Sequence, residues 1–454
     1  MIETDLRSST ATPRRSGSGM ARRLRQLGML GVSQAGVTLT AFVTQVLLAR
    51  SLPQAQFGAF MSVMSLVTLA APLATFGVAD FWLQRFGREG PRAFRWVRPS
   101  IVLVAVSSGL LVAALVGWGL VELDEPADAG LRIALAPIIL SLVAMALSGA
   151  ALQLRGAYGQ LAALQLAPQV GRLLVALLTG ILGLSALMVA LGYALVAVVT
   201  VVMSVLVIAP FWHGRATLEG HPPAPRPSTR RPRVDHLVAG TGLFLLGSLF
   251  YQLGMNLGVV TSAEFLSPED AAVLAVPMTL LTAIYLLPRI VYQQYFLAKL
   301  HRWSRSNRNA VLIAYRAGTI GMIGLGVLLG VVVAVAGRFA IPLIFGSQYR
   351  ASVPVMAVLA IAIPLRFGAA SVESLLTSNG LVRQKVLYQG LGSLAFLAAL
   401  ATAIPLFGAA GAAWATVLSE AILLTLFWAK AKRKVVADAE LPSWAEIRRT
   451  FARS

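Results

Sequence analysis

Apolar residues recur along the chain in twelve runs of roughly twenty residues, separated by short polar segments. A helix of this length crosses the ~30 Å hydrocarbon layer of a bilayer, so each run predicts one membrane span. The first six runs are 27–49, 57–77, 101–120, 133–152, 161–182 and 187–208. The second six are 237–260, 271–296, 311–336, 353–376, 386–404 and 410–427. The pattern predicts an all-α integral membrane protein with twelve transmembrane helices.

Basic residues gather in alternate connecting segments. The N-terminal tail, the loops after spans two, six and eight, and the C-terminal tail are rich in arginine and lysine, whereas the loops after spans three and seven are acidic. Because Lys and Arg are retained on the cytoplasmic side, both termini are predicted to be cytoplasmic. Four arginines fall on the opposite side: Arg50, Arg132, Arg338 and Arg350.

Composition agrees with a membrane protein, since 57% of the residues are hydrophobic and only 12% are charged. The net charge of +20 is then mainly a topology signal, and we expect no nucleic-acid partner. The absence of cysteine excludes disulfides, thiol catalysis and cysteine metal sites. Four histidines in or beside cytoplasmic loops lack metal-ligand spacing, so neither a metal nor a cofactor is expected: His213, His221, His236 and His301.

A proline-rich polar segment, residues 211–235, divides the spans into two sets of six and is predicted to be a flexible or extended linker. It follows a basic tail (1–26) and a first six-helix bundle (27–210), and precedes a second bundle (236–429). A basic tail (430–454) ends the chain, and in it Ser443, Trp444 and Glu446 predict a short interfacial helix. Leu52–Gly58 and Leu266–Ala272 enter equivalent spans, which indicates a parallel repeat of the two halves.

Polar residues form stripes on equivalent spans of the two halves. Residues three to four positions apart share one face of a helix, and polar faces turn away from lipid. Spans one, two, seven and eight are therefore predicted to line a cavity, although such residues could also serve only to link helices by hydrogen bonds. The stripes contain Gln34, Thr38 and Gln45 in span one, Ser248, Gln252 and Asn256 in span seven, and Tyr285, Arg289 and Tyr292 in span eight.

Charged residues also occur within the predicted spans. Three arginines, Arg172, Arg289 and Arg366, are too costly to expose to lipid and are candidates for a hydrated, cationic cavity. Their charge favours an anionic substrate, because guanidinium groups bind phosphate bidentately. The acids Asp80, Glu373 and Glu420 could each pair with an arginine or take up a coupling proton or sodium ion.

An ordered set of motifs resembles the bacterial polysaccharide-export flippases of the multidrug, oligosaccharidyl-lipid and polysaccharide exporter superfamily. The motifs are Leu48–Gly58 after span one, Phe345–Pro354, Leu376–Gly380, and the glycine- and alanine-rich entry to the last span at Ile404–Ala415. The resemblance implies a V-shaped pair of bundles in the bacterial inner membrane. It also implies alternating access that moves undecaprenyl-diphosphate-linked oligosaccharide to the outer leaflet for surface polysaccharide such as lipopolysaccharide or exopolysaccharide.

The same resemblance suggests roles for the polar residues. Arg289 and Arg366 would contact the diphosphate with Arg172 in support, whereas the sugar would face Tyr251, Gln252, Asn256, Tyr285 and Tyr292. Membrane lipids, a polysaccharide polymerase and glycosyltransferases are the implied partners.

Two alternatives stay open. A drug or other small-molecule antiporter of the same fold is disfavoured, because span one lacks an acid and a positive interior repels cationic drugs. A membrane glycosyltransferase or polymerase is disfavoured because no paired carboxylates for metal-nucleotide binding are present and the extracytoplasmic loops are short. We therefore expect a transporter rather than an enzyme.

Overall fold

The computed structural model describes residues 17–122, 126–221, 234–288, 312–378 and 380–436, and all the regular elements in these residues are helices. The proposed site residues Arg289 and Tyr292, and the predicted interfacial helix around Trp444, lie outside the described residues.

The first half contains eight α-helices and one 3-10 helix. They are α1 (Gly17–Ser51), α2 (Gln54–Thr75), α3 (Val78–Glu89), η1 (Gly90–Trp96), α4 (Val97–Val121), α5 (Pro126–Leu135), α6 (Pro137–Leu154), α7 (Tyr158–Leu182) and α8 (Ala186–Trp212).

The second half begins with α9 (Val234–Phe265) and α10 (Pro268–Pro288). After residues 289–311 it continues with η3 (Ala314–Gly318), α13 (Thr319–Phe345), η4 (Ser347–Tyr349), α14 (Ser352–Ser378), α15 (Val382–Phe407), α16 (Ala409–Ala431) and η5 (Lys432–Val436).

Eleven stretches of the described residues are long and apolar enough to cross a membrane. One of them, Gln54–Val121, is 68 residues long and contains α2 and α4 as separate helices joined by α3 and η1. Counting α2 and α4 separately gives twelve spans among the described residues. The prediction of an all-α, multi-pass membrane protein is therefore confirmed.

Two of the predicted boundaries were wrong. Span nine was expected to end at Ala336, yet α13 continues to Phe345, and the guanidinium of Arg338 lies 4.6 Å from the ring centroid of Phe339. A long arginine side chain can reach water from inside a helix, so the charge does not end α13. Span four is made of two helices, α5 and α6, which meet at Pro137, and Arg132 belongs to α5 rather than to a loop.

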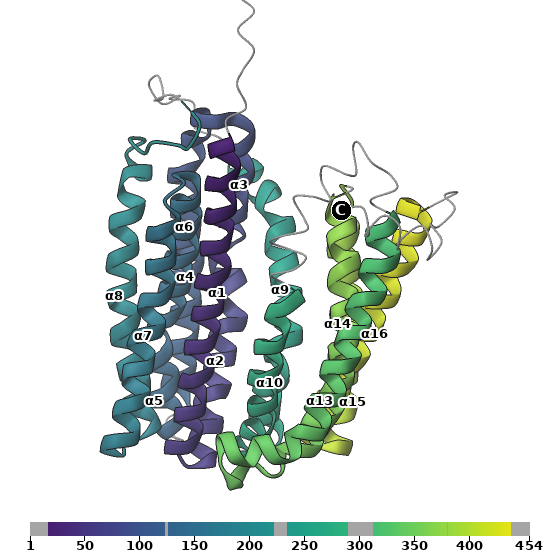
Figure 1. Cartoon of the computed structure of the whole chain (residues 1–454). Coiled ribbons are helices and arrows are strands. Elements are labelled where there is room, and N and C mark those ends of the chain that lie inside the picture. The colour runs from purple at the N-terminus through teal and green to yellow at the C-terminus, as the bar shows by residue number, and fades with distance from the viewer. Residues whose placement is uncertain (1–16, 123–125, 222–233, 289–311, 379, 437–454) are drawn as a thin grey trace, which may run out of the picture.

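The helices form two clusters that approach each other at one face and stand apart at the other (Figure 1). Helices α1–α8 make one cluster and α13–α16 the other, with α9 and α10 between them. The clusters meet at the end of the molecule where the chain passes from α1 to α2. We call this end the α1–α2 face. The first described helix begins, and α16 ends, at the opposite face.

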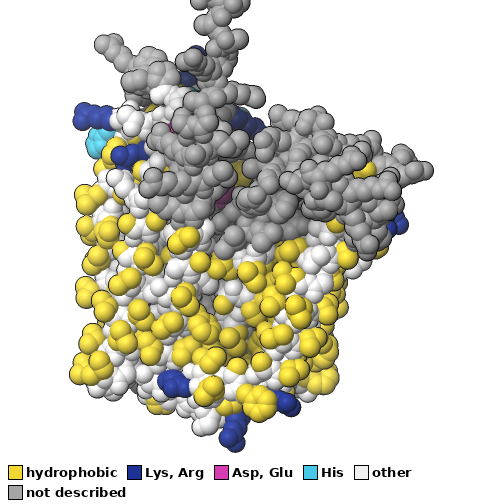
Figure 2. All heavy atoms as spheres, viewed as in Figure 1, with side chains coloured by type: hydrophobic (Ala, Val, Ile, Leu, Met, Phe, Trp, Pro, Cys, Tyr) yellow, Lys and Arg dark blue, Asp and Glu magenta, His cyan; other side chains and the backbone are white. Residues whose placement is uncertain are grey.

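Apolar side chains form a broad band across the visible side of the molecule (Figure 2). Many apolar residues of the long helices are exposed, as lipid contact requires, among them Leu110, Ile181, Leu195, Leu206, Leu328 and Leu394. Aromatic residues, by contrast, fill the interior near α3, where Trp82 stacks on Phe211 with ring centroids 6.1 Å apart.

The start of the predicted linker is packed rather than flexible. Leu218 is buried, and the backbone N–H of Glu219 donates a 2.9 Å hydrogen bond to the carbonyl of Leu154 at the end of α6. The carboxylate of Glu219 also lies against Gly156. Residues 213–221 therefore belong to the first half, and 222–233 lie outside the described residues.

Candidate substrate cavity

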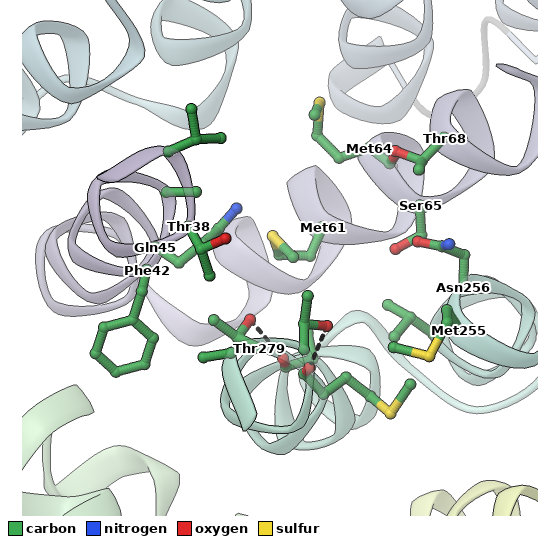
Figure 3. Close-up of a pocket in the computed structure, with 17 residues that line it drawn as sticks. Thr38, Phe42, Gln45, Met61, Met64, Ser65, Thr68, Met255, Asn256 and Thr279 are labelled. Atoms are coloured by element: carbon green, nitrogen blue, oxygen red, sulfur yellow. Dashed lines mark hydrogen bonds between the residues drawn. The ribbon is translucent and has the colours of Figure 1, made fainter. Parts of the chain in front are cut away.

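A cavity of about 290 Å³ lies where α1, α2, α9 and α10 meet, between the two halves of the chain (Figure 3). These are the four helices that the sequence predicts to line a cavity. The lining residues are Val37, Thr38, Ala41, Phe42 and Gln45 of α1, Met61, Met64, Ser65 and Thr68 of α2, Met255, Asn256 and Val259 of α9, and Ala275, Met278, Thr279, Thr282 and Ala283 of α10.

The described lining is uncharged and combines soft apolar groups with neutral hydrogen-bonding groups. Four of the residues are methionines, whose flexible thioether side chains adapt to ligands of different shape. The amide oxygen of Gln45 is buried without a hydrogen-bond partner among the described residues. Such a surface suits a neutral, hydroxyl-rich ligand better than a charged one, since an unmet acceptor is satisfied by a ligand hydroxyl.

Of the remaining predicted amides, only Asn256 lines this cavity. The Gln252 side chain donates a 3.2 Å hydrogen bond to the carbonyl of Thr68 and so links α9 to α2. Asn256 lines the cavity while its amide donates a 3.3 Å bond to the carbonyl of Gln252. Gln34 lies about three turns before Gln45 on α1 and is not among the residues that line the cavity.

A second, smaller cavity of about 30 Å³ is lined by two charged residues of the second half, Arg366 and Glu420. It is lined by Phe250, Tyr251, Gly254, Met255, Arg366, Gln389, Ser393, Ser419, Glu420 and Leu423. Met255 lines both cavities, so a single thioether side chain forms part of the wall between them. We call this smaller space the side cavity.

Arg366 is the central cation of the side cavity. Its Nη1 lies 3.7 Å from Glu420 Oε1, a loose ion pair. The guanidinium also lies 5.1 Å from the ring centroid of Tyr251 and 6.0 Å from that of Tyr285. Aromatic faces attract cations, so these two rings stabilise the guanidinium without using its hydrogen-bond donors.

A second ion pair, missed in the sequence, lies nearby on α14 and α15. Lys385 Nζ is 2.7 Å from Glu373 Oε1, and the Glu373 side chain is almost fully buried. Within these two ion pairs, the charges of two cations and two carboxylates therefore balance. Lys385, Gln389 and Ser393 recur every four residues on α15 and form a polar stripe like that on α9. This spacing could have identified α15 as a helix that lines a polar cavity.

Several oxygen atoms in this region have no partner among the described residues. They are Gln389 Oε1, Glu420 Oε2, Glu373 Oε2 and the Tyr285 hydroxyl oxygen. Gln389 and Glu420 both line the side cavity, which is large enough for about one water molecule. Buried acceptors without partners are costly, so this space suits a water molecule, a proton or a small cation.

The first half also contains a half-buried cation. The guanidinium of Arg172 lies 5.3 Å from the ring centroid of Tyr193, and its Nε has no hydrogen-bond partner among the described residues. Arg172 lines neither cavity. Asp80, at the start of α3, is exposed, and its charge interacts with that of Lys385 on α15. The structure thus brings Arg366, Tyr251, Tyr285 and Glu420 together and keeps Arg172 apart from them.

The architecture is that of a multi-pass membrane protein with two helical halves around a central cavity. The chain belongs to the polysaccharide biosynthesis protein family, whose model matches residues 24–289, more than half of the sequence. No match is found among curated proteins.

Solved structures share the fold at low sequence identity. The lipid II flippase MurJ in an inward closed conformation is 11% identical, with a TM-score of 0.68 over 89% of this chain and 87% of that one. The multidrug transporter DinF-BH, solved as a complex, is 16% identical, with a TM-score of 0.66 over 95% of this chain and all of that one. A transporter from Pyrococcus furiosus Vc1, described as having a binding pocket of reverse polarity, is 14% identical, with a TM-score of 0.59 over 91% and 95%. These likenesses show that the chain shares the fold of these three proteins.

Proposed function

We propose that this protein is a flippase that moves undecaprenyl-diphosphate-linked oligosaccharide units from the inner to the outer leaflet of a bacterial inner membrane. The observation that carries the proposal is the uncharged, amide-bearing cavity between the two halves, in a chain of the polysaccharide biosynthesis family. Neutral amides and threonines are suited to sugar hydroxyls, and the nearby arginine is suited to the diphosphate.

In this proposal the two cavities bind different parts of the substrate. Gln45 and Asn256 face the sugar next to the diphosphate, and Arg366 takes a phosphate oxygen in place of Glu420. The loose geometry of the Arg366–Glu420 pair supports such an exchange, since a bidentate phosphate contact is stronger than one long ion pair. At about 290 Å³ the central cavity is at the small end of the ~300–1,000 Å³ range of ligand sites. A unit of several sugars then requires the halves to separate further.

The orientation follows from the charge pattern. With both termini cytoplasmic, the α1–α2 face is extracytoplasmic, and substrate enters from the opposite side, where the helix clusters stand apart (Figure 1). Glycosyltransferases that build the lipid-linked unit and a polymerase that consumes it are the expected partners.

Deleting the gene tests the function directly. We expect the deletion strain to lose surface polysaccharide and to accumulate a polyprenyl-diphosphate-linked oligosaccharide, because synthesis continues while transfer to the outer leaflet stops. Mass spectrometry of extracted lipids measures the accumulation, and a plasmid copy of the gene should reverse it. A deletion strain with no accumulated glycolipid would contradict the proposal.

Glu420 is the proposed coupling group, with Gln389 completing the side cavity. When a phosphate engages Arg366, Glu420 loses its counter-charge and takes up a proton or a monovalent cation, because an unpaired buried carboxylate is unfavourable. We expect Glu420→Gln, which keeps the shape of the side chain and removes its charge, to uncouple transport from an imposed ion gradient.

The measurement is ion movement in everted membrane vesicles on addition of the lipid-linked saccharide, followed with dyes for protons and for sodium. Glu269→Gln is the matched control, since Glu269 is an exposed acid at the start of α10. Gradient-dependent transport that is equal in both variants would remove Glu420 from the coupling step.

A further inference from the structure

Two of the four arginines that depart from the charge pattern lie in contacts between the halves at the α1–α2 face. Arg132 of α5 forms ion pairs with Glu122, at the end of α4, and with Glu264, near the end of α9. Glu122 belongs to the first half and Glu264 to the second. Arg132 therefore links the two halves through one guanidinium, and the distance from its Nη2 to Glu264 Oε1 is 3.4 Å.

The surroundings hold Arg132 in this position. Its side chain is only 6% exposed, whereas those of Glu122 and Glu264 are 44% and 38% exposed. The guanidinium lies 4.6 Å from the ring centroid of Trp118, and the indole of Trp118 donates a 2.6 Å hydrogen bond to Glu122. That hydrogen bond and the charge of Arg132 hold the pKa of Glu122 below its ordinary value, so its carboxylate stays ionised at neutral pH.

Arg50 makes a second link between the halves, at the last turn of α1. Its Nε donates a 2.7 Å hydrogen bond to the carbonyl of Ile344, and its Nη2 donates to the carbonyl of Leu343, both at the end of α13. The final carbonyls of a helix are unpaired and carry partial negative charge, so a guanidinium is a fitting partner.

Two side chains of the second half also donate hydrogen bonds to the end of α1. Gln348 donates a 2.8 Å hydrogen bond to the carbonyl of Ala49, and the Tyr349 hydroxyl donates a 3.2 Å bond to the same oxygen. Ala49 and Tyr349 are fully buried, so the hydrogen bond between them acts in a low-dielectric setting, where it is strongest.

We propose that Arg132 and Arg50 form a latch that closes the α1–α2 face and must open once in each transport cycle. Few basic residues lie on this side of the predicted membrane. Each of these two arginines has a role there, because it joins one half of the chain to the other. The inference rests on the proposed function only in requiring alternating access, and it assigns to these residues a role in gating rather than in substrate binding.

The structure supplies a matched pair of variants for the test. Glu264→Gln weakens the ion pair between the halves, whereas Glu122→Gln weakens the pair of the same arginine within the first half. Since the chain has no cysteine, a single Ser65→Cys placed in the cavity wall reports access to the cavity through labelling by a membrane-impermeant maleimide. The assay uses right-side-out vesicles and no glycan. A negative result would therefore contradict the latch without bearing on the proposed substrate.

We expect Glu264→Gln to raise the labelling rate about fivefold, which corresponds to about 1 kcal/mol in the closed-to-open equilibrium. Glu122→Gln should label at the parent rate. Gln348→Ala, which removes the bond to Ala49, should also raise the rate and provides a second variant with both carboxylates intact. Equal rates in the parent, Glu264→Gln and Gln348→Ala proteins would overturn the latch, as would an increase in Glu122→Gln equal to that in Glu264→Gln.

Discussion

Replacing Arg366 with alanine is expected to abolish surface polysaccharide. The substitution removes the proposed diphosphate contact, and a charge-assisted hydrogen bond of about 1.5–3 kcal/mol corresponds to a loss of roughly ten- to a hundredfold in binding. It also leaves Glu420 buried without its cation, which costs about 3–5 kcal/mol of folding stability. Loss of polymer in this variant alone could therefore reflect either a lost contact or a lost fold.

The double variant Arg366→Ala/Glu420→Ala separates the two causes. With both charges removed, no unpaired charge is left in the side cavity, so protein abundance and melting temperature should recover toward those of the parent. Polysaccharide should remain absent, because both the guanidinium and the proposed coupling carboxylate are missing. Arg338→Ala, at an exposed arginine of α13, is the control and should leave both quantities unchanged. Normal polymer in the double variant would remove Arg366 from substrate binding.

Gly58→Ala is expected to produce the largest loss of stability among conservative substitutions. A Cβ atom on Gly58 would lie 1.7 Å from the carbonyl oxygen of Pro268 and 3.1 Å from the backbone nitrogen of Ala272. Backbone atoms cannot rotate away as a side chain can, so α2 and α10 must move apart. Overpacking of this kind costs about 1–3 kcal/mol and occasionally more.

Gly36→Ala on α1 is the matched control for this substitution. No atom lies within 4 Å of a Cβ built at Gly36, and alanine is favoured over glycine in a helix by about 0.5–1 kcal/mol. Thermal unfolding of purified protein, followed by size-exclusion chromatography with fluorescence detection, should show a lower midpoint for Gly58→Ala and an unchanged or higher one for Gly36→Ala. Equal midpoints would mean that α2 and α10 are not in close contact in solution.

The helices and the position of the central cavity could be predicted from the sequence, because both depend on local patterns. Runs of apolar residues define the spans, and the polar stripes of α1 and α9 identify the helices that meet at the cavity. The methionines that make up much of its wall gave no such signal, since an apolar residue at a cavity resembles one that faces lipid.

Charge pairing could not be predicted in the same way. Glu373 and Arg366 share a face of α14, yet each pairs with a residue of another helix, Lys385 of α15 and Glu420 of α16. These partners depend on the rotation and depth of neighbouring helices, which no local pattern determines. The latch at Arg132 has the same origin, because it joins α5 to α9 across 132 positions of sequence.

The 32-residue helix α9 is positioned to transmit ligand occupancy to the latch. Tyr251 of α9 lies against Arg366, Met255 and Asn256 face the central cavity, and Glu264 reaches Arg132 near the end of the same helix. A long helix moves largely as a rigid rod, so a small tilt near Tyr251 displaces the carboxylate of Glu264 as well. A mechanical lever of this kind would let the protein sense its cargo before releasing it on the opposite side of the bilayer.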